Sequence, residues 1–217
     1  LNIVVRLMHI TFGIAWIGAS FYFVFLENAL NRTKNVRDEL AGNLWAVHGG
    51  GFYYLEKYKI APKEIPRDLH WFKYEAYFTW ISGVALLFVV YYFNASAFLI
   101  DKNVLDIAPA WAIALGMGSF VVAWLLYDAL CKTTLVGKGI WFALLGFLIA
   151  AGFAYGYTQV FSARAAYMHF GGMLGTIMAA NVFFNIIPAQ KAMVRAAKEG
   201  KPLDPSIGCV VVAAELH

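Results

Sequence analysis

PAWAIALGMGSFVVAWLLYDAL, residues 109–130, contains one charged side chain, Asp128. About 20 predominantly apolar residues are needed to cross the hydrocarbon core of a bilayer as an α-helix. Four other stretches have the same character, and we expect spans at 3–26, 76–93, 109–130, 138–158 and 163–187. The sequence therefore predicts an all-α integral membrane helical bundle with five transmembrane helices in the lipid bilayer.

The composition agrees with a membrane protein, because 61% of the residues are hydrophobic and only 14% are charged, against about 25% charged in soluble domains. The net charge of +4 does not indicate a nucleic-acid partner, since the Lys and Arg residues lie in loops that flank apolar spans. The two cysteines, Cys131 and Cys209, form no Cys-x-x-Cys-His motif. Covalent c-type haem is therefore excluded within this chain.

The distribution of Lys and Arg predicts the orientation. They concentrate in the long loop after the first span and in the segment after the fifth, whereas the loop after the second span has Lys102 beside two Asp residues. Positively charged loops face the cytoplasm. We therefore expect the N-terminus outside, the C-terminus in the cytoplasm, and a large cytoplasmic loop after the first helix.

Two local features need a separate interpretation. Residues 44–58 are too aromatic for a solvated loop and are interrupted by three consecutive glycines, so we expect a helix or re-entrant turn packed against the bundle. Pro188 follows the fifth span. Because proline lacks the N–H of a helical residue, we expect it to end that helix.

Two histidines lie inside spans, where ionisable side chains are costly and are often functional. His9 and His169 each lie six residues from the outer end of their span, which corresponds to about 9 Å at 1.5 Å per residue. Two imidazoles at equal depth suit the axial ligation of a b-type haem, and Arg6 and Arg164 lie outward of them, where haem propionates would be. Alternatively, each histidine hydrogen-bonds a neighbouring helix.

A second polar group lies toward the inner side of the membrane. It contains His48, His70, Glu75 and Asn181. Imidazole, amide and aromatic groups together would suit a flat polar heterocycle, but the residues alone leave other ligands open.

Four runs resemble a known family: LMHITFGIAWIGASFYFVFLENAL (7–30), LWAVHGGGFYYLEKYKIAP (44–62), LHWFKYEAYFTWISG (69–83) and MAANVFFNIIPAQK (178–191). They are similar to the membrane domain of the bacterial membrane-bound urate hydroxylases, the urate oxidase N-terminal domain. The resemblance implies a multi-pass enzyme of purine breakdown in the bacterial inner membrane. It would oxidise urate toward 5-hydroxyisourate and pass electrons to cytochrome c, which is commonly fused at the C-terminus of family members.

The resemblance also suggests roles for the polar residues. Urate would enter from the cytoplasm, with His70 or Glu75 as the base and with electrons leaving through haem b at His9 and His169. A second haem, ligated by His48 or His70, would bridge the distance between the inner site and the outer haem. The substrate-binding residues that we expect are His48, Gly49, Gly50, Gly51, Tyr53 and Asn181.

The end of the sequence departs from the family pattern. Family members continue through three further spans, whereas this chain runs CVVVAAELH after Gly208. We therefore expect a membrane domain over 1–208 that lacks the last three helices, followed by an atypical tail over 209–217. The alternative function is a truncated non-catalytic or haem-carrying subunit of a larger membrane redox complex, with other subunits covering the exposed face. A transporter ranks last, because no discontinuous helix pair is evident.

Overall fold

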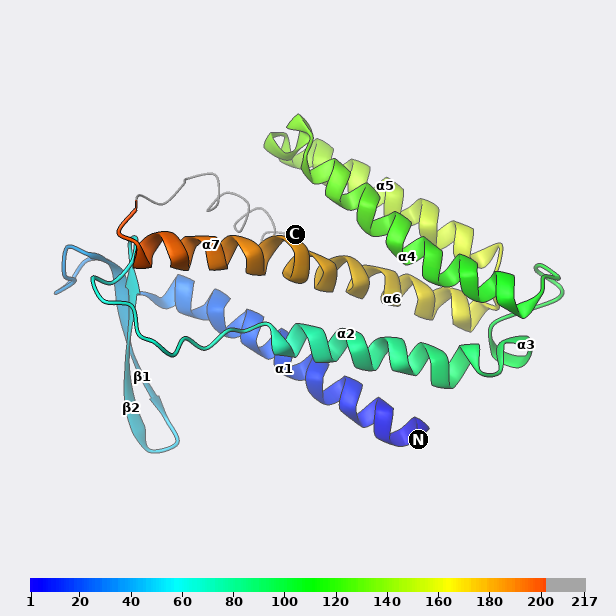
Figure 1. Cartoon of the computed structure of the whole chain (residues 1–217), viewed down its shortest axis with the longest axis horizontal. Coiled ribbons are helices and arrows are strands. Elements are labelled where there is room, and N and C mark those ends of the chain that lie inside the picture. The colour runs from blue at the N-terminus through cyan, green and yellow to red at the C-terminus, as the bar shows by residue number, and fades with distance from the viewer. Residues whose placement is uncertain (202–217) are drawn as a thin grey trace. The chain divides into compact units, whose positions relative to one another are not determined.

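The computed structural model describes residues 1–201, and these are mostly helical (Figure 1). Within them, five helical segments are long and apolar enough to cross a membrane. Each overlaps a predicted span, and the fifth continues beyond its predicted end. The segments are Asn2–Ala29, Tyr74–Tyr92, Pro109–Cys131, Gly139–Thr158 and Ala163–Lys198. The tail expected over 209–217 lies outside the described residues.

The elements follow one another in a simple order. The α-helices are α1 (Asn2–Ala29), α2 (Tyr74–Leu87), α3 (Ala95–Phe98), α4 (Pro109–Cys131), α5 (Gly139–Thr158), α6 (Ala163–Asn181) and α7 (Ile187–Lys198). The strands are β1 (Leu40–His48) and β2 (Gly51–Tyr58). Two π-helical turns, η1 (Phe88–Tyr92) and η3 (Val182–Ile186), follow α2 and α6, and a 3₁₀ turn, η2 (Thr134–Gly137), precedes α5.

The chain forms two compact units. The helical unit contains Leu1–Phe12 and Ala76–Val182, and the hairpin unit contains Gly13–Glu75 and Phe183–His217, of which the residues up to 201 are described. The first and fifth span-length segments each contribute to both units. We describe each unit by itself.

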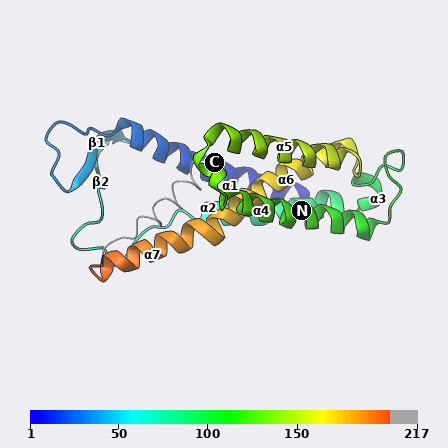
Figure 2. The ribbon, with the colours of Figure 1, turned by 90° about the horizontal axis from the view of Figure 1, so that it is seen from above.

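The core of the helical unit depends on small side chains at helix contacts. α6 packs against both α4 and α5 (Figures 1 and 2). Ala112 on α4 and Ala165 on α6 have no exposed surface, and such small residues let helix backbones approach closely. Larger side chains then fill the remaining space. Phe120, Phe161 and Met173 are almost completely buried in the same cluster.

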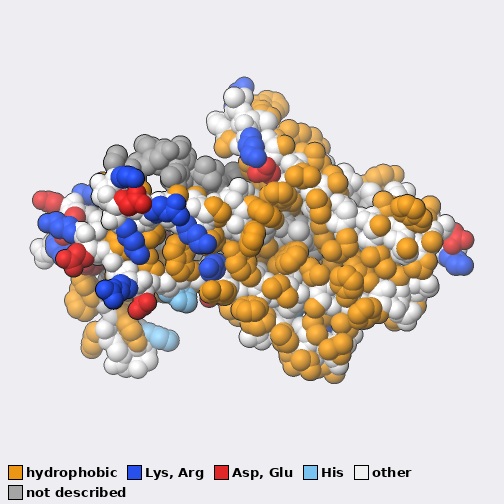
Figure 3. Space-filling view, viewed as in Figure 1, with side chains coloured by type: hydrophobic (Ala, Val, Ile, Leu, Met, Phe, Trp, Pro, Cys, Tyr) orange, Lys and Arg blue, Asp and Glu red, His pale blue; other side chains and the backbone are white. Residues whose placement is uncertain are grey.

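The outer surface of the span-length helices is apolar. At most 22% of each 18-residue apolar window is buried within the structure, and for α1 none is. Hydrophobic side chains cover most of the face of the helical unit seen in Figure 3. A soluble monomer rarely exposes so much contiguous apolar surface, so this surface is consistent with contact with lipid.

Residues 44–58 form a β-hairpin, so the prediction of a helix or re-entrant turn, and with it an entirely α-helical fold, is wrong. β1 and β2 pair in antiparallel register from Leu40–Tyr58 to His48–Gly51. The two loop residues, Gly49 and Gly50, have φ values of 56° and 79°. A two-residue loop with positive φ at both positions matches the right-handed twist of paired strands. The glycines therefore make the turn of a sheet.

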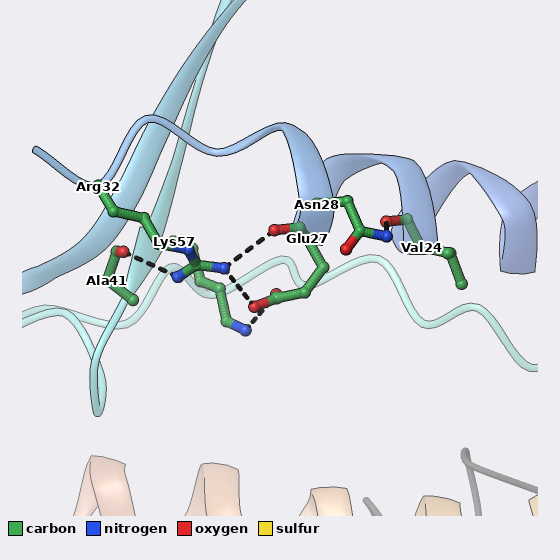
Figure 4. Close-up of polar contacts among 6 residues, drawn as sticks. All are labelled: Val24, Glu27, Asn28, Arg32, Ala41 and Lys57. Atoms are coloured by element: carbon green, nitrogen blue, oxygen red, sulfur yellow. Dashed lines mark hydrogen bonds and ion pairs between the residues drawn. The ribbon is translucent and has the colours of Figure 1, made fainter.

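The base of the hairpin is tied to the end of α1 by charged groups (Figure 4). Arg32 donates to the Glu27 carboxylate at 2.7 Å and to the carbonyl of Ala41 on β1 at 3.1 Å. Lys57 on β2 pairs with the other carboxylate oxygen of Glu27. Glu27 thus links the last turn of the first helix to both strands.

Pro188 does not end the fifth helix, contrary to the prediction. The helical run continues from Ala163 to Lys198, with the π-helical turn η3 directly before α7. A proline in a helix removes one main-chain hydrogen bond and crowds the carbonyl four residues earlier, and a π-turn widens the helix at such a point. The wider turn allows the helix to continue past the proline.

Candidate functional site

The most enclosed polar side chain of the helical unit is His169 on α6, which has no exposed surface. Its Nδ1 donates to the carbonyl of Ala165 at 2.8 Å, four residues earlier on the same helix. Its Nε2 accepts a hydrogen bond from the Tyr92 hydroxyl at 2.9 Å. Because a buried polar group without a partner is costly, these two bonds explain how an imidazole is accommodated here.

Aromatic rings surround this imidazole on several sides. The ring of Phe161 lies closest, with centroids 4.6 Å apart, and the rings of Tyr92, Phe120 and Tyr157 lie at 5.7 to 6.1 Å. Tyr157 in turn exchanges a 2.7 Å hydrogen bond with Ser119 on α4. His169 is therefore held by groups from α4, α5, α6 and η1.

The π-turn η1 supplies two adjacent tyrosines to this cluster. Tyr91 and Tyr92 are both buried, and the hydroxyl of Tyr91 accepts a hydrogen bond from Nε of Arg164 at 3.2 Å. Arg164, a predicted propionate partner, therefore lies on the side of the cluster formed by Tyr91. The sequence analysis missed both tyrosines. The sequence feature that could have indicated them is a pair of hydroxyl-bearing residues at the end of an apolar span.

His9 contacts α2, at a point before η1 along the chain. Its Nδ1 is 3.1 Å from the carbonyl oxygen of Thr79 and 3.2 Å from the Ser82 hydroxyl, both on α2. The ring also approaches Gly83, where an added Cβ would lie 3.0 Å from Cε1 of His9. Arg6, the other predicted propionate partner, donates to Asn2 at 2.5 Å and is exposed.

The hydrogen bonds of the two histidines indicate which ring nitrogen of each could bind a metal. Each holds Nδ1 against a main-chain carbonyl oxygen, so Nδ1 carries the proton and the lone pair lies on Nε2. In His169 that lone pair accepts the Tyr92 hydroxyl. Such an outer hydrogen bond is usual for an imidazole that binds a metal. Among residues 1–201, no group of three or more His, Cys, Asp or Glu side chains suits a metal ion.

The spacing of the two histidines differs from the equal depth that the sequence suggested. His9 contacts α2 at Ser82 and His169 contacts η1 at Tyr92, ten residues further along, which corresponds to about 15 Å. Metal–imidazole bonds of about 2 Å place two axial nitrogens about 4 Å apart. The predicted equal depth is counted from the first residue of each span. Because α1 has 28 residues, which is more than a span requires, its first residue does not mark the outer boundary of the membrane. A shared iron therefore needs α1 in another position along α2.

The hairpin turn brings several of the predicted substrate residues together. His48 and Gly51 face each other across the two-residue loop of Gly49 and Gly50. The ring of Tyr53 lies over Gly51, where an added Cβ would be 3.3 Å from Cε2 of the tyrosine. All of these residues except the partly covered Gly51 are exposed. Asn181, by contrast, is buried in the helical unit.

His70 and Glu75, the predicted catalytic residues, lie in the segment that leads into α2. The exposed ring of His70 makes an edge contact with Phe72 at 4.5 Å between centroids, and Phe72 contacts Phe23 of α1. Glu75 is half-buried in the first turn of α2, where the helix dipole stabilises a carboxylate. Both residues belong to the hairpin unit.

The structure is consistent with a multi-pass membrane protein that has a polar group in its helical interior. It has five helices long enough to span a membrane, apolar outer surfaces and a fully buried, hydrogen-bonded imidazole. A family model described as urate oxidase N-terminal matches residues 1–217, and the chain belongs to this family. Membership in this family indicates a urate-related oxidoreductase. No curated protein and no solved structure matches the chain at a significant level.

Proposed function

We propose that the chain is the membrane domain of a urate hydroxylase that transfers electrons from urate to cytochrome c. The observation that carries this proposal is the family match over the whole sequence. In the reaction, urate and one water give 5-hydroxyisourate, two protons and two electrons, and two molecules of oxidised cytochrome c take up the electrons. The oxygen atom of the product therefore comes from water.

The helical unit would hold the redox cofactor, haem b. His169 and His9 are the candidate axial ligands through Nε2, provided that α1 takes another position along α2. Arg164 and Arg6 are candidate partners for the propionates. A bound haem would supply one-electron transfer between the substrate and cytochrome c. Ligation by His169 would require the Tyr92 hydroxyl to leave Nε2, because that hydroxyl occupies the lone pair.

The hairpin unit would provide the proton chemistry and the contacts to urate. His70 is exposed and within five residues of Glu75 in sequence, so either group can take a proton that urate releases on oxidation. The N–H groups of Gly49 to Gly51, the imidazole of His48 and the phenol of Tyr53 are hydrogen-bonding groups for the oxo and imide edges of the substrate. Asn181, the remaining residue of the predicted set, belongs to the helical unit.

The proposal includes an orientation in a bacterial inner membrane. Most Lys and Arg residues belong to the hairpin unit, and positively charged segments remain in the cytoplasm. The hairpin unit would then receive urate from the cytoplasm, and the N-terminus would lie outside, where cytochrome c is the electron acceptor. Other membrane subunits are candidate partners for the helical surface.

The reaction stoichiometry tests this function. Purified protein in detergent or nanodiscs is mixed with urate and oxidised cytochrome c, and the reduction of cytochrome c and the loss of urate are recorded. We expect two cytochromes reduced for each urate consumed, one oxygen atom from labelled water in the product, and no hydrogen peroxide. Peroxide formation, or no urate loss despite bound haem, contradicts the proposal. The second result supports the haem-carrying subunit instead.

A further inference from the structure

A groove in the hairpin unit lies between the segment before α2 and the last helix. Its volume is about 420 Å³, which is within the range of about 300 to 1,000 Å³ for small-molecule pockets. The lining residues are Trp71, Lys191, Val194, Arg195, Lys198 and Glu199. The groove thus combines one aromatic side chain with one face of α7.

The charge of this groove is positive. Lys191, Arg195 and Lys198 are spaced four and three residues apart on α7, which places them on one helical face. Within residues 1–201, none of the three makes an ion pair with a carboxylate. The one acidic lining residue, Glu199, is paired with Lys201 at 2.6 Å. Figure 3 shows the Lys and Arg side chains gathered over α7.

The aromatic lining residue, Trp71, distinguishes this groove from a general anion site. Trp71 is half-buried, and its indole offers a flat surface on which a heterocycle can stack. Trp71 also follows the candidate base His70 directly in sequence. A ligand stacked on Trp71 would therefore lie at the segment that carries the proposed proton acceptor.

We propose that this groove, in place of the hairpin turn at Gly49 to Gly51, binds the planar urate anion, with Trp71 as the stacking surface and Arg195 and Lys191 as the charge partners. The inference rests on the proposed function for the identity of the anion. The planar Arg guanidinium can bind an oxo group and a ring nitrogen with two parallel hydrogen bonds. Urate is a monoanion at neutral pH, so two or more unpaired cations favour it over neutral purines.

Equilibrium dialysis of labelled urate against the purified full chain tests the groove. We expect Arg195→Gln and Trp71→Leu each to weaken binding about tenfold, whereas Trp71→Phe, which keeps an aromatic face, stays close to the wild type. Lys34→Gln is the matched control. It removes one positive charge from an exposed position of the same unit, and we expect no change in binding.

The outcomes separate this inference from the proposed function. If Arg195→Gln and Trp71→Leu both leave urate binding unchanged, urate does not bind in the groove. If only Arg195→Gln weakens binding, the proposal is also wrong, because that result indicates a site for phosphate or lipid headgroups. If wild-type protein reduces cytochrome c with urate, Arg195→Gln should raise KM about tenfold with kcat unchanged, as expected for lost substrate binding. If wild-type protein binds urate through the groove without reducing cytochrome c, only the proposed function fails.

Discussion

The contact between His169, Tyr92 and Gly116 is the most constrained point of the helical unit. A Cβ added at Gly116 on α4 would lie 2.9 Å from Nε2 of His169 and 3.0 Å from the Tyr92 hydroxyl. Real Cβ atoms do not approach other atoms so closely, and the surrounding aromatic rings leave the imidazole little room to move. Gly116 is therefore required for the hydrogen bond that satisfies the buried imidazole.

This close contact predicts different effects for two neighbouring glycines. Gly116→Ala should be less stable than Gly118→Ala by about 2 kcal/mol, because overpacking costs about 1–3 kcal/mol. Both changes add the same methyl group to α4, but nothing lies within 4 Å of a Cβ at Gly118. Unfolding in mixed detergent micelles measures the difference. Equal stabilities of the two variants would contradict the packing described for His169.

The sequence identified the candidate histidine but not its partners. An imidazole in an apolar span is conspicuous, because ionisable groups in lipid are costly, so His169 was found directly. Tyr92 lies 77 residues away and Gly116 lies on a third helix. Their contact depends on how helices pack against one another, which the spacing along a single helix does not contain.

The hairpin β1–β2 is an element whose sequence signals are present although the sequence analysis predicts a helix or re-entrant turn there. Two glycines between aromatic and β-branched runs are typical of a two-residue hairpin loop. Large side chains also face each other across the two strands, with Trp45 opposite Tyr54 and Val47 opposite Phe52. The aromatic content of residues 44–58 favours packing against the bundle, whereas in the structure these aromatic side chains are largely exposed.

The two π-turns are a second feature that residue patterns did not reveal. η1 places Tyr91 and Tyr92 in the core, and η3 precedes Pro188. A π-turn inserts one residue into a helix without changing its apolar character, so hydropathy cannot detect it. The span-length helices themselves were predicted well, because their length and apolarity are set by the bilayer.

At the scale of the whole molecule, the number of spans followed from hydropathy, and the orientation remains a prediction from charge. The helical run from Ala163 to Lys198 has 36 residues, or about 54 Å at 1.5 Å per residue, which exceeds a hydrocarbon core of about 30 Å. The charged residues of α7 lie at one end of this run. We therefore expect that end to project into the cytoplasm.

Labelling from one side of the membrane tests this orientation. Cysteines replace Lys34 or Lys102 in a background with Cys131→Ser and Cys209→Ser, and right-side-out vesicles receive a membrane-impermeant maleimide. We expect Lys102→Cys to react in intact vesicles and Lys34→Cys to react only after the vesicles are opened, because positive segments stay inside. The reverse pattern would show that the N-terminus faces the cytoplasm.

In the proposed function, electrons move from urate through a haem held by the histidines of this chain. Urate is added to the purified protein without oxygen or cytochrome c, and the absorption spectrum is recorded. We predict that urate alone produces the band of reduced b-type haem, that His169→Ala removes it, and that His9→Ala removes it as well if both rings bind one iron. Two results would contradict this function. In the first, dithionite reduces the haem but urate does not; in the second, the band is unchanged in both variants.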